Sequence, residues 1–339
     1  MVASTTDGSR ACARAHTLTN EETRNHMKRL MRAVLAALAG VATVAAVSAC
    51  STSDTANAGK GTGEGGNGNA VITVIASSNQ WGSLAKELGG DYVDVTSILN
   101  NTGTDAHDYE PTTNDISKIQ NAQVAVVNGA GYDDWALKAA QQSSKTLVVD
   151  AADASGVKTG DNPHIWFSAN ARIKTADAIT ADYIKLQPAH KAQFEQLHKT
   201  WLDEEQQLDK DLKELAKDKG SKNYAAVESV AQYLAEDMGL TDVTPKGYKQ
   251  ASANESEPTP SDIKEFTDLL KKGDMRMFIT NSQEPSEMND QLVAVADSGN
   301  VPVVDVTEQM PDQYKSLHEW MRALAKQIQE TNGGSKSGK

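Results

Sequence analysis

The sequence predicts an α/β fold with two doubly wound lobes that are joined by one long rigid helix. Three observations indicate this fold. Short β-rich runs alternate with helical runs in the first part of the chain, one long amphipathic stretch interrupts the alternation, and a second alternating set follows it. The length of 339 residues also suits two lobes of on the order of 100–150 residues each.

The first alternating set spans residues 71–188 and predicts a parallel sheet covered by helices. Its opening run, Val71-Ile72-Thr73-Val74-Ile75-Ala76, is almost entirely apolar, which is typical of a strand buried on both faces. Strands that alternate with helices pair in parallel, because each helix returns the chain to the same end of the sheet. We expect strands at 71–76, 92–99, 124–127 and 146–150 and helices at 79–88, 115–120, 134–142 and 169–186.

A long helix is predicted at 189–218, directly after Pro188 ends the preceding helical run. Its apolar residues recur at spacings of three, four or seven and therefore form one stripe along one face. A single stripe without repeated heptads favours a rigid spine that packs on both lobes over a coiled coil. The residues of the stripe are Phe194, Leu197, Trp201, Leu208, Leu212 and Leu215.

The second alternating set spans residues 219–331 and predicts a second lobe. Pro260 and Ser261 mark the start of one of its helices. No internal repeat is visible in the sequence, although the shared alternation permits a common architecture. Residues 332–339 are predicted to be a disordered tail. We expect strands at 223–227, 276–280 and 301–306 and helices at 230–238, 261–271, 287–296 and 313–329.

The first 50 residues contain a predicted lipoprotein signal. A positive cluster at 28–32 precedes an apolar run at 33–47, which at about 15 residues is too short for a membrane span of roughly 20. The run ends in Val47-Ser48-Ala49-Cys50, which resembles a bacterial lipobox, so Cys50 is the predicted lipidation site. A cysteine with two or more acyl chains would anchor the chain to the bilayer on the extracytoplasmic face. An ordinary signal peptide with an incidental cysteine is the alternative.

Residues 1–26 are polar and lack periodicity, so translation is predicted to start at Met27. Residues 51–70 are rich in Gly, Ser, Thr and Asn and predict a flexible tether between membrane and lobes. Cys12 and Cys50 are the two cysteines of the sequence, and neither falls in the predicted lobes. No disulfide and no thiolate metal site is therefore expected in the lobes.

The formal net charge of −13 argues against a nucleic-acid partner, because such a partner requires a basic face. An acidic surface attracts cations weakly and without selectivity, and it also keeps a secreted protein soluble. The charge alone therefore indicates no specific ligand.

Two histidines differ from the others in their predicted surroundings. His107 and His164 follow predicted strands and stand in loops at strand carboxyl ends, where ligands of open α/β sheets gather. Pro111 and Pro163 lie close to them in sequence and fix the backbone, which lowers the entropy lost when an imidazole binds a metal. From spacing alone, two loop histidines are a weak signal of a metal site.

The other five histidines have simpler explanations. His16 and His26 precede the predicted processing site. His190, His198 and His318 fall within predicted helices among charged neighbours. We expect these three to be solvated or partly packed helix residues rather than metal ligands.

Five motifs stand in the same order as in a known family. They are Asn162-Pro163-His164-Ile165-Trp166 and Glu257-Pro258-Thr259-Pro260-Ser261-Asp262, together with the stretches 79–90, 103–112 and 128–135. From about Val71 to Ile328 the chain resembles the zinc- and manganese-specific solute-binding proteins of ABC importers. The resemblance implies two lobes joined by one long helix, a transported metal ion as ligand and no enzymatic activity. It also implies an ABC permease and its ATPase as partners of a monomeric binding protein.

The resemblance further implies a ligand set in the cleft between the lobes. The two histidine motifs of the first lobe each supply one imidazole, and these are His107 and His164. The third ligand, a histidine or glutamate after the first strand of the second lobe, falls on Glu228. The fourth, a carboxylate after the last strand, falls on Asp305 or Glu308. We favour Glu308, because Asp305 is still within the strand run.

Two imidazoles and two carboxylates suit a borderline or hard divalent ion, and the two carboxylates cancel its charge. The chain lacks the third histidine and the histidine-rich loop of many zinc-specific relatives, so its carboxylate-rich set favours Mn²⁺. The general affinity order nevertheless favours Zn²⁺ over Mn²⁺. Because imidazole must be neutral to bind a metal, affinity is expected to fall in acid. Ser168-Ala169 replaces the usual Asp-Pro of the family after the second histidine motif, which leaves the local loop geometry open.

Two other functions fit parts of the pattern. Histidine and carboxylate ligands with an open position for water would permit a metallohydrolase. The sequence has no HExxH motif, however, and four protein ligands leave little room for a catalytic water. A chelated metal or a vitamin would require a wide aromatic pocket, whereas only 5% of the residues are aromatic. The sequence thus predicts an extracytoplasmic protein that binds Mn²⁺ or Zn²⁺ for import.

Overall fold

The computed structural model describes residues 71–104, 106, 109–217 and 220–331, all of which belong to one compact unit. The predicted signal with Cys50, the tether, the C-terminal tail and His107 lie outside the described residues. Among the residues that are described, no helix combines the length and the apolar composition needed to cross a bilayer.

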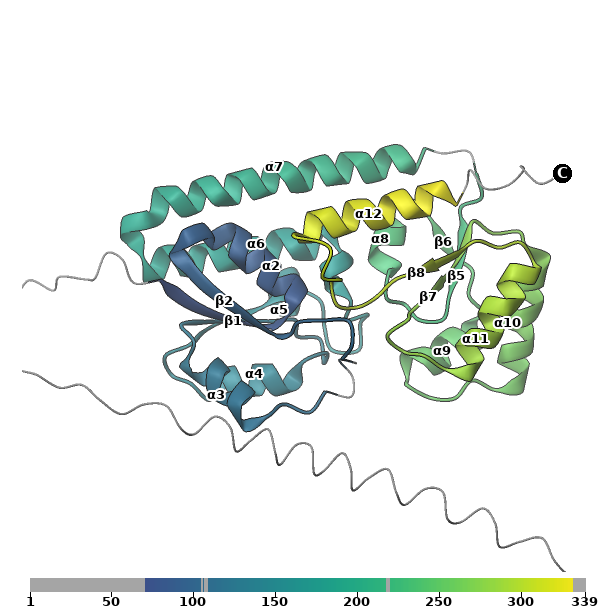
Figure 1. The fold of residues 1–339 in the computed structure, drawn as a ribbon, viewed down its shortest axis with the longest axis horizontal. Coiled ribbons are helices and arrows are strands. Elements are labelled where there is room, and N and C mark those ends of the chain that lie inside the picture. Colours follow the sequence, from purple (N-terminus) through teal and green to yellow (C-terminus); the bar gives the residue numbers. More distant parts are fainter. Residues whose placement is uncertain (1–70, 105, 107–108, 218–219, 332–339) are drawn as a thin grey trace, which may run out of the picture. The chain divides into compact units, whose positions relative to one another are not determined.

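Two four-stranded parallel sheets form the centres of the two lobes (Figure 1). In spatial order the first sheet contains β2 (Val93–Leu99), β1 (Ile72–Ser78), β3 (Val124–Val127) and β4 (Leu147–Asp150), and the second contains β6 (Thr241–Asp242), β5 (Asn223–Ala226), β7 (Met277–Thr280) and β8 (Val303–Asp305). Both sheets follow the chain order 2-1-3-4, so the lobes share a topology that the sequence does not reveal as a repeat. The sheets confirm the predicted fold class, and their carboxyl edges are where such folds place ligands.

Helices cover the sheets and link the lobes (Figure 1). The helices are α2 (Asn79–Gly89), α3 (Thr113–Asn121), α4 (Asp134–Gln141), α5 (Ala151–Ser155), α6 (Ala169–Leu186), α7 (Lys191–Leu215), α8 (Gln232–Asp237), α9 (Lys246–Ala253), α10 (Pro260–Lys272), α11 (Glu287–Ser298) and α12 (Leu317–Glu330), with 3-10 turns η1 (Gly90–Tyr92), η2 (Ile165–Phe167) and η3 (Pro188–His190). The elements α5, α9 and β6 were not predicted, because segments of two to eight residues carry too few apolar positions to show a period. The predicted single helix from residue 189 is a 3-10 turn followed by α7.

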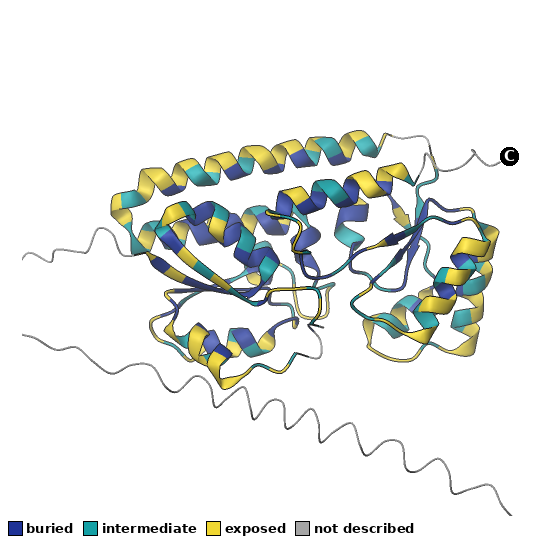
Figure 2. Cartoon of the chain, in the orientation of Figure 1, coloured by how far each residue is buried: buried dark blue, intermediate teal, exposed yellow. Residues whose placement is uncertain are grey.

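The hydrophobic core is continuous between the two lobes. Val124 and Val126 of β3 share one buried cluster with Met277 and Ile279 of β7. The same cluster includes buried residues of α2, α6, α7 and α12, so these four helices pack against the same core as the two sheets. Figure 2 shows buried residues on the strands and exposed residues along the outer side of α7.

In β3 and β7, the residues that alternate with the members of this shared cluster point to the other face of each sheet, as the pleat requires. Ala125 and Val127 pack in a separate cluster with residues of α3 and α4. Phe278 packs in a third cluster with residues of α10 and α11. Each sheet is thus covered on both faces, which explains why the central strands β3 and β7 are apolar almost without interruption.

The apolar stripe predicted for the spine helix is present on α7. Phe194, Trp201, Leu208 and Leu212 are buried, and the remaining two members of the stripe are partly buried. The helix contacts α2 and α6 of the first lobe as well as α8 and α12. In addition, α12 lies beside α7 and contacts α2, so the C-terminal helix also connects the lobes (Figure 1).

A buried ion network ties α6, α7 and α12 together. Arg172 of α6 pairs with Glu205 of α7 at 2.5 Å between Nη2 and Oε1, and His318 of α12 lies 2.8 Å from the second oxygen of Glu205. All three residues are almost completely inaccessible to solvent. The prediction that His318 is solvated or partly packed was therefore wrong. Its imidazole stacks on Trp201 with ring centroids 5.0 Å apart.

The charges of this network stabilise one another. Burial alone would raise the pKa of Glu205, but the guanidinium of Arg172 and the imidazole of His318 outweigh it and lower the pKa to about 2. Arg172 also donates from Nη1 to the backbone oxygen of Trp166 at 3.0 Å. The network therefore fixes the turn η2 to the three helices.

Replacing Glu205 with glutamine should lower the free energy of unfolding by about 3–5 kcal/mol at pH 7, because Arg172 would stay buried without its counter-charge. The pKa of Glu205 is depressed in the folded state, so its contribution is present above its ordinary pKa of 4.5 and is lost as the pH falls toward 2. The stability difference between native protein and Glu205→Gln should accordingly shrink below pH 4.5. Denaturant unfolding at a series of pH values measures both effects.

The matched control is Glu195→Gln, which changes an exposed glutamate of the same helix whose partner is Lys191 at 3.5 Å. Its effect should stay below about 1 kcal/mol. Equal stability of Glu205→Gln and Glu195→Gln would contradict the role of the network. A stability difference between native protein and Glu205→Gln that is the same at pH 7 and pH 3 would contradict it as well.

Candidate metal centre

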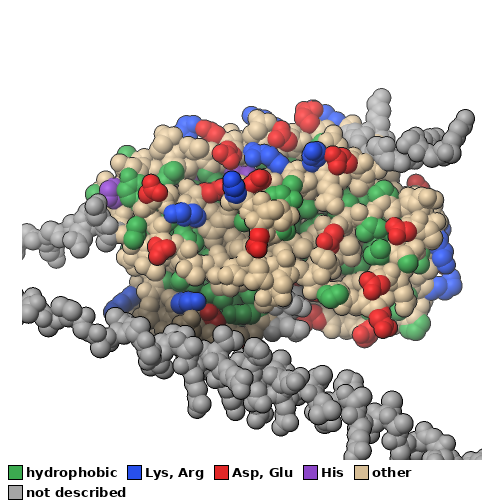
Figure 3. Space-filling view, viewed as in Figure 1, with side chains coloured by type: hydrophobic (Ala, Val, Ile, Leu, Met, Phe, Trp, Pro, Cys, Tyr) green, Lys and Arg blue, Asp and Glu red, His purple; other side chains and the backbone are tan. Residues whose placement is uncertain are grey.

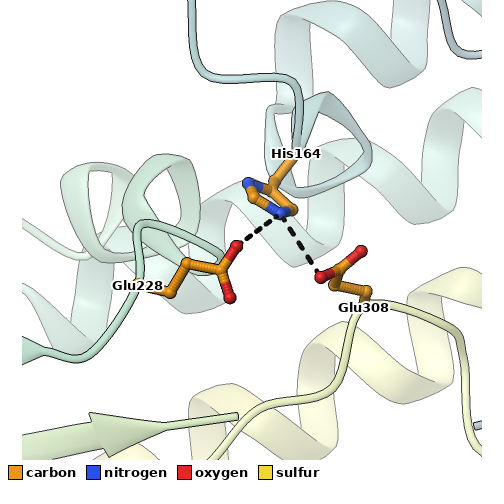
Figure 4. Close-up of side chains that lie close together, drawn as sticks. All are labelled: His164, Glu228 and Glu308. Carbon is orange, nitrogen blue, oxygen red and sulfur yellow. Dashed lines mark ion pairs between the residues drawn. The ribbon is translucent and has the colours of Figure 1, made fainter. Parts of the chain in front are cut away.

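Three of the predicted ligands lie together in the structure (Figure 4). Nε2 of His164 is 3.5 Å from Oε1 of Glu228 and 3.9 Å from Oε1 of Glu308. The ligand atoms of the three residues all lie within 4.8 Å of one another. His164 belongs to the first lobe and follows β4 and α5, whereas the two glutamates follow β5 and β8 of the second lobe. The cluster therefore joins residues of both lobes.

The other residues that the sequence singled out are placed differently. Asp305, the alternative to Glu308, ends β8 as an exposed residue and accepts hydrogen bonds from the backbone nitrogen and the hydroxyl of Ser282 at 2.8 and 2.7 Å. The structure thus brings Glu308, and not Asp305, next to His164. His198 lies 2.9 Å from Asp177 at the surface of α7. His107 lies outside the described residues.

Asn162 sets the orientation of the His164 ring. Nδ2 of Asn162 donates to the backbone oxygen of Ser229 at 2.7 Å, which directs Oδ1 toward His164. This oxygen accepts from the backbone nitrogen of His164 at 3.0 Å and lies 2.7 Å from Nδ1 of the ring. The proton of the neutral imidazole is therefore assigned to Nδ1, and the lone pair of Nε2 faces the two carboxylates.

The position of Nε2 fits a metal ligand. His164 is 2% exposed, and its Nε2 has no hydrogen-bond partner among the described residues. A buried polar atom without a partner is costly and calls for an explanation such as an ion. Two ligands bound to zinc at about 2.1 Å in tetrahedral geometry would stand about 3.4 Å apart. The measured separations of 3.5 and 3.9 Å from Nε2 are close to that value.

The loop after β3 presents Tyr132 to the cluster. Gly129 and Ala130 have left-handed backbone conformations, with φ of 74° and 55°. The turn wraps around Asp133, whose carboxylate accepts from the backbone nitrogens of Asn128 and Gly129 at 2.6 and 2.8 Å. Burial raises the pKa of Asp133 to about 6, and these hydrogen bonds oppose the rise. The tight turn thereby places the hydroxyl of Tyr132 beside the carboxylate of Glu308.

Two hydrogen-bond donors contact the carboxylates. The hydroxyl of Tyr132 donates to Oε2 of Glu308 at 2.7 Å. Asn281, which directly follows β7, donates from Nδ2 to Oε2 of Glu228 at 3.1 Å and to Oε1 of Glu308 at 3.5 Å. Burial, followed by the charge of Glu308, raises the pKa of Tyr132 well above its usual value, so the hydroxyl keeps its proton.

The backbone around Glu308 is held by amides from both lobes. Gln80 of α2 donates to the backbone oxygen of Glu308 at 3.0 Å, and Gln283 of the second lobe accepts from its backbone nitrogen at 2.6 Å. Asn79 exchanges two hydrogen bonds with the backbone of Met310, at 2.7 and 3.0 Å. The segment that carries Glu308 therefore cannot leave His164 without breaking contacts with the first lobe.

Solvent has little access to the cluster. His164 and Glu308 are each 2% exposed, and the side chain of Glu228 is 15% exposed. Two carboxylates held this close in a buried site repel each other unless a cation or hydrogen-bond donors compensate their charges. The cluster therefore has the donor atoms, the spacing and the charge of a site for a divalent cation.

Sequence reasoning assigned no role to Asn281 or Tyr132. Tyr132 stands close behind the apolar strand β3 of the first sheet, and Asn281 directly follows the apolar strand β7 of the second. The same criterion, applied to amides and hydroxyls as well as histidines, would have found both residues.

The Ser168-Ala169 replacement has a local explanation, because Ser168 is the N-cap of α6 and its hydroxyl accepts from the backbone nitrogen of Ala171 at 3.5 Å.

The family match and the named relatives place the chain in the class of substrate-binding proteins of metal ABC importers. It belongs to the family described as "Zinc-uptake complex component A periplasmic", whose profile matches residues 74–331.

Named relatives support this assignment. The chain is 25% identical over 250 residues to the metal ABC transporter substrate-binding lipoprotein SsaB of Streptococcus sanguinis, a match that covers 68% of this chain and 78% of that protein. It is 26% identical over 246 residues to the manganese-binding lipoprotein MntA of Bacillus subtilis, with coverage of 69% and 78%. The iron ABC transporter substrate-binding lipoprotein MtsA of Streptococcus pyogenes serotype M1 is 27% identical over 219 residues, with coverage of 59% and 68%.

Solved structures share the fold. A crystal structure of ZnuA superposes with a TM-score of 0.65 at 19% identity and covers 77% of this chain and 98% of its own. A mutant of the laminin-binding adhesin Lmb from Streptococcus agalactiae gives a TM-score of 0.65 at 24% identity, with coverage of 77% and 99%. At these identities the likeness concerns the fold alone.

Proposed function

We propose that this chain is an extracytoplasmic binding protein that captures Mn²⁺ or Zn²⁺ and delivers it to an ABC permease with its ATPase. The observation that carries the proposal is the cluster of the buried residues His164 and Glu308 with the partly buried Glu228 at the contact of the two lobes. Membership of the family supports the same class of cargo.

The proposed ligands are His107 and His164 from the first lobe and Glu228 and Glu308 from the second. The three described members lie together, and His107 is added from its position in the motif at 103–112. Two imidazole nitrogens and two carboxylate oxygens neutralise a divalent ion and suit both zinc and manganese. The names of two relatives specify manganese and iron, and the family description specifies zinc, so a first-row divalent ion is the shared chemistry.

The burial of the cluster favours transport over hydrolysis. A metallohydrolase keeps one coordination position open for water and substrate, whereas His164 and Glu308 are each only 2% exposed. An ion held by ligands from both lobes acts as a bridge between them. We infer that loading stabilises the closed pair of lobes and that release requires the segment around Glu308 to leave the first lobe.

The acidic chain is not expected to bind nucleic acid. Acidic and basic side chains are interspersed on the face shown in Figure 3. This distribution agrees with a soluble carrier that recognises its cargo in a buried site rather than through a charged surface.

The proposal includes an anchor and a division of the chain. The three relatives are named lipoproteins, which supports Cys50 as the acylated residue that holds a monomeric carrier on the outer face of the cell membrane. The proposed division is upstream segment and signal (1–50), tether (51–70), first lobe (71–188), spine helix (189–218), second lobe (219–331) and tail (332–339).

Metal-free protein titrated with Zn²⁺ and Mn²⁺ in competition should bind one ion per chain. His164→Ala and Glu228→Ala should each weaken binding by more than about 100-fold, because loss of a ligand costs more than loss of a hydrogen bond to a ligand. His198→Ala removes a histidine that pairs with Asp177 at the surface and should leave binding unchanged. Native affinity in both site variants would exclude the proposed site.

The anchor is tested by Cys50→Ala in cells that carry the full chain. The variant should appear in the medium instead of the membrane fraction, since no acyl chain would hold it. Cys12→Ala serves as the control and should stay in the membrane fraction. Retention of Cys50→Ala at the membrane would refute lipid anchoring at this residue.

A further inference from the structure

Asn281 is oriented so that its amide nitrogen points at both carboxylates. It is 3% exposed, and its Oδ1 accepts from the backbone nitrogen of Gln283 at 3.0 Å. Nδ2 must therefore be the atom that faces Glu228 and Glu308, at 3.1 and 3.5 Å. Because an amide nitrogen carries two hydrogens, Asn281 can donate to both glutamates at once.

The hydroxyl proton of Tyr132 is directed in a similar way. The hydroxyl oxygen accepts from Nε2 of Gln309 at 3.0 Å, so its own proton is donated to Oε2 of Glu308 at 2.7 Å. Gln309 is itself oriented, since its Oε1 accepts from Nε2 of Gln283. Gln283 in turn accepts from the backbone nitrogen of Glu308 at 2.6 Å. The backbone N–H group of Glu308 always donates, so it fixes the direction of every hydrogen bond in this series from Gln283 through Gln309 to Tyr132.

The donors divide the oxygens of each carboxylate into two roles. Oε2 of Glu228 accepts from Asn281 at 3.1 Å and Oε2 of Glu308 accepts from Tyr132 at 2.7 Å, whereas the contact of Asn281 with Oε1 of Glu308 is longer, at 3.5 Å. In both glutamates Oε1 is the oxygen that lies near Nε2 of His164, at 3.5 and 3.9 Å. For either carboxylate to offer both oxygens to one ion, it would have to rotate so that Oε2 also turns toward His164, and its hydrogen bond through Oε2 opposes that rotation.

The number of oxygens offered matters for the choice of ion. Zinc in protein sites is almost always four-coordinate and tetrahedral, whereas manganese prefers about six ligands, mostly oxygen, in octahedral geometry. Two imidazoles and two carboxylates that each give one oxygen supply four donor atoms. Carboxylates that give two oxygens each would raise the number to six.

We propose that Asn281 and Tyr132 are positioning residues that restrict Glu228 and Glu308 to one metal-binding oxygen each and thereby favour zinc over manganese. This inference rests on the proposed function and narrows its cargo. The number of carboxylates alone favours manganese, but the hydrogen bonds that hold them favour the ion with fewer ligands.

The experiment compares the full-length native protein with Asn281→Leu and Tyr132→Phe. Asn281→Leu removes the amide donor and keeps the branched shape of the side chain, and Tyr132→Phe removes only the hydroxyl, so one variant remains informative if the other does not fold. The control is Asn289→Leu, which removes an amide that donates to the backbone oxygen of Glu284 at 2.9 Å in the same lobe. Affinities for Zn²⁺ and Mn²⁺ are measured by competition with a chelator, and X-ray absorption at the zinc edge counts the ligands in each zinc-loaded protein.

Each site variant should lose about 10- to 100-fold in zinc affinity and less in manganese affinity, as expected when a group that orients a ligand is removed. The ratio of zinc to manganese affinity should fall at least about tenfold, and the ligand count around zinc should rise above four as a carboxylate turns. Asn289→Leu should keep the native ratio and count.

An unchanged affinity ratio together with an unchanged ligand count in both variants would overturn the inference. An equal loss of both ions at a constant ligand count would also overturn it, because it would show that the two residues only support the fold. If native protein binds neither ion, the proposed function fails and this inference fails with it. If native protein binds both ions and the variants keep its ratio, only the inference fails.

Discussion

A buried and a partly buried carboxylate that face one buried imidazole are the constraint on which the rest of the structure depends. Glu228 and Glu308 would repel each other in a site with little solvent, and the cost of holding them together must be offset. The fold offsets part of it with the Asn281 amide and the Tyr132 hydroxyl. In the proposed function a divalent cation offsets the remainder, which would couple ion binding to the contact between the lobes. Selectivity then depends on how firmly the donors hold each carboxylate.

The scaffold keeps this arrangement in place through a second charged group. The Arg172, Glu205 and His318 network joins α6, α7 and α12, and Arg172 also holds the backbone oxygen of Trp166. Trp166 lies two residues beyond His164, and the two rings contact edge to face with centroids 5.3 Å apart. The position of the imidazole is therefore linked to the spine helix. The same helices contribute buried residues to the core that the two sheets share, so the site and the fold share their support.

Much of the fold could be predicted from the sequence because its main elements are long and periodic. The strand at 124–127 and the helix at 169–186 have the predicted ends, and Glu308, which the sequence favoured over Asp305, lies beside His164. The hydrogen bonds of the site could not be predicted in this way. Tyr132 and Glu308 are separated by 176 positions, and no local pattern records such a pairing. The burial of His318 was missed for the same reason, since its partner Glu205 is 113 positions away.

The most direct test of the account is the free energy of unfolding of metal-free and zinc-loaded protein, measured for the native chain and for Glu308→Gln. Glutamine keeps the shape of the side chain but removes one of the repelling charges. The account predicts that the metal-free variant is at least as stable as the native protein. It also predicts that zinc at about 100 times the native dissociation constant stabilises native protein by about 2.7 kcal/mol and the variant by far less. A variant that is less stable without metal and gains as much from zinc as the native protein would contradict the account.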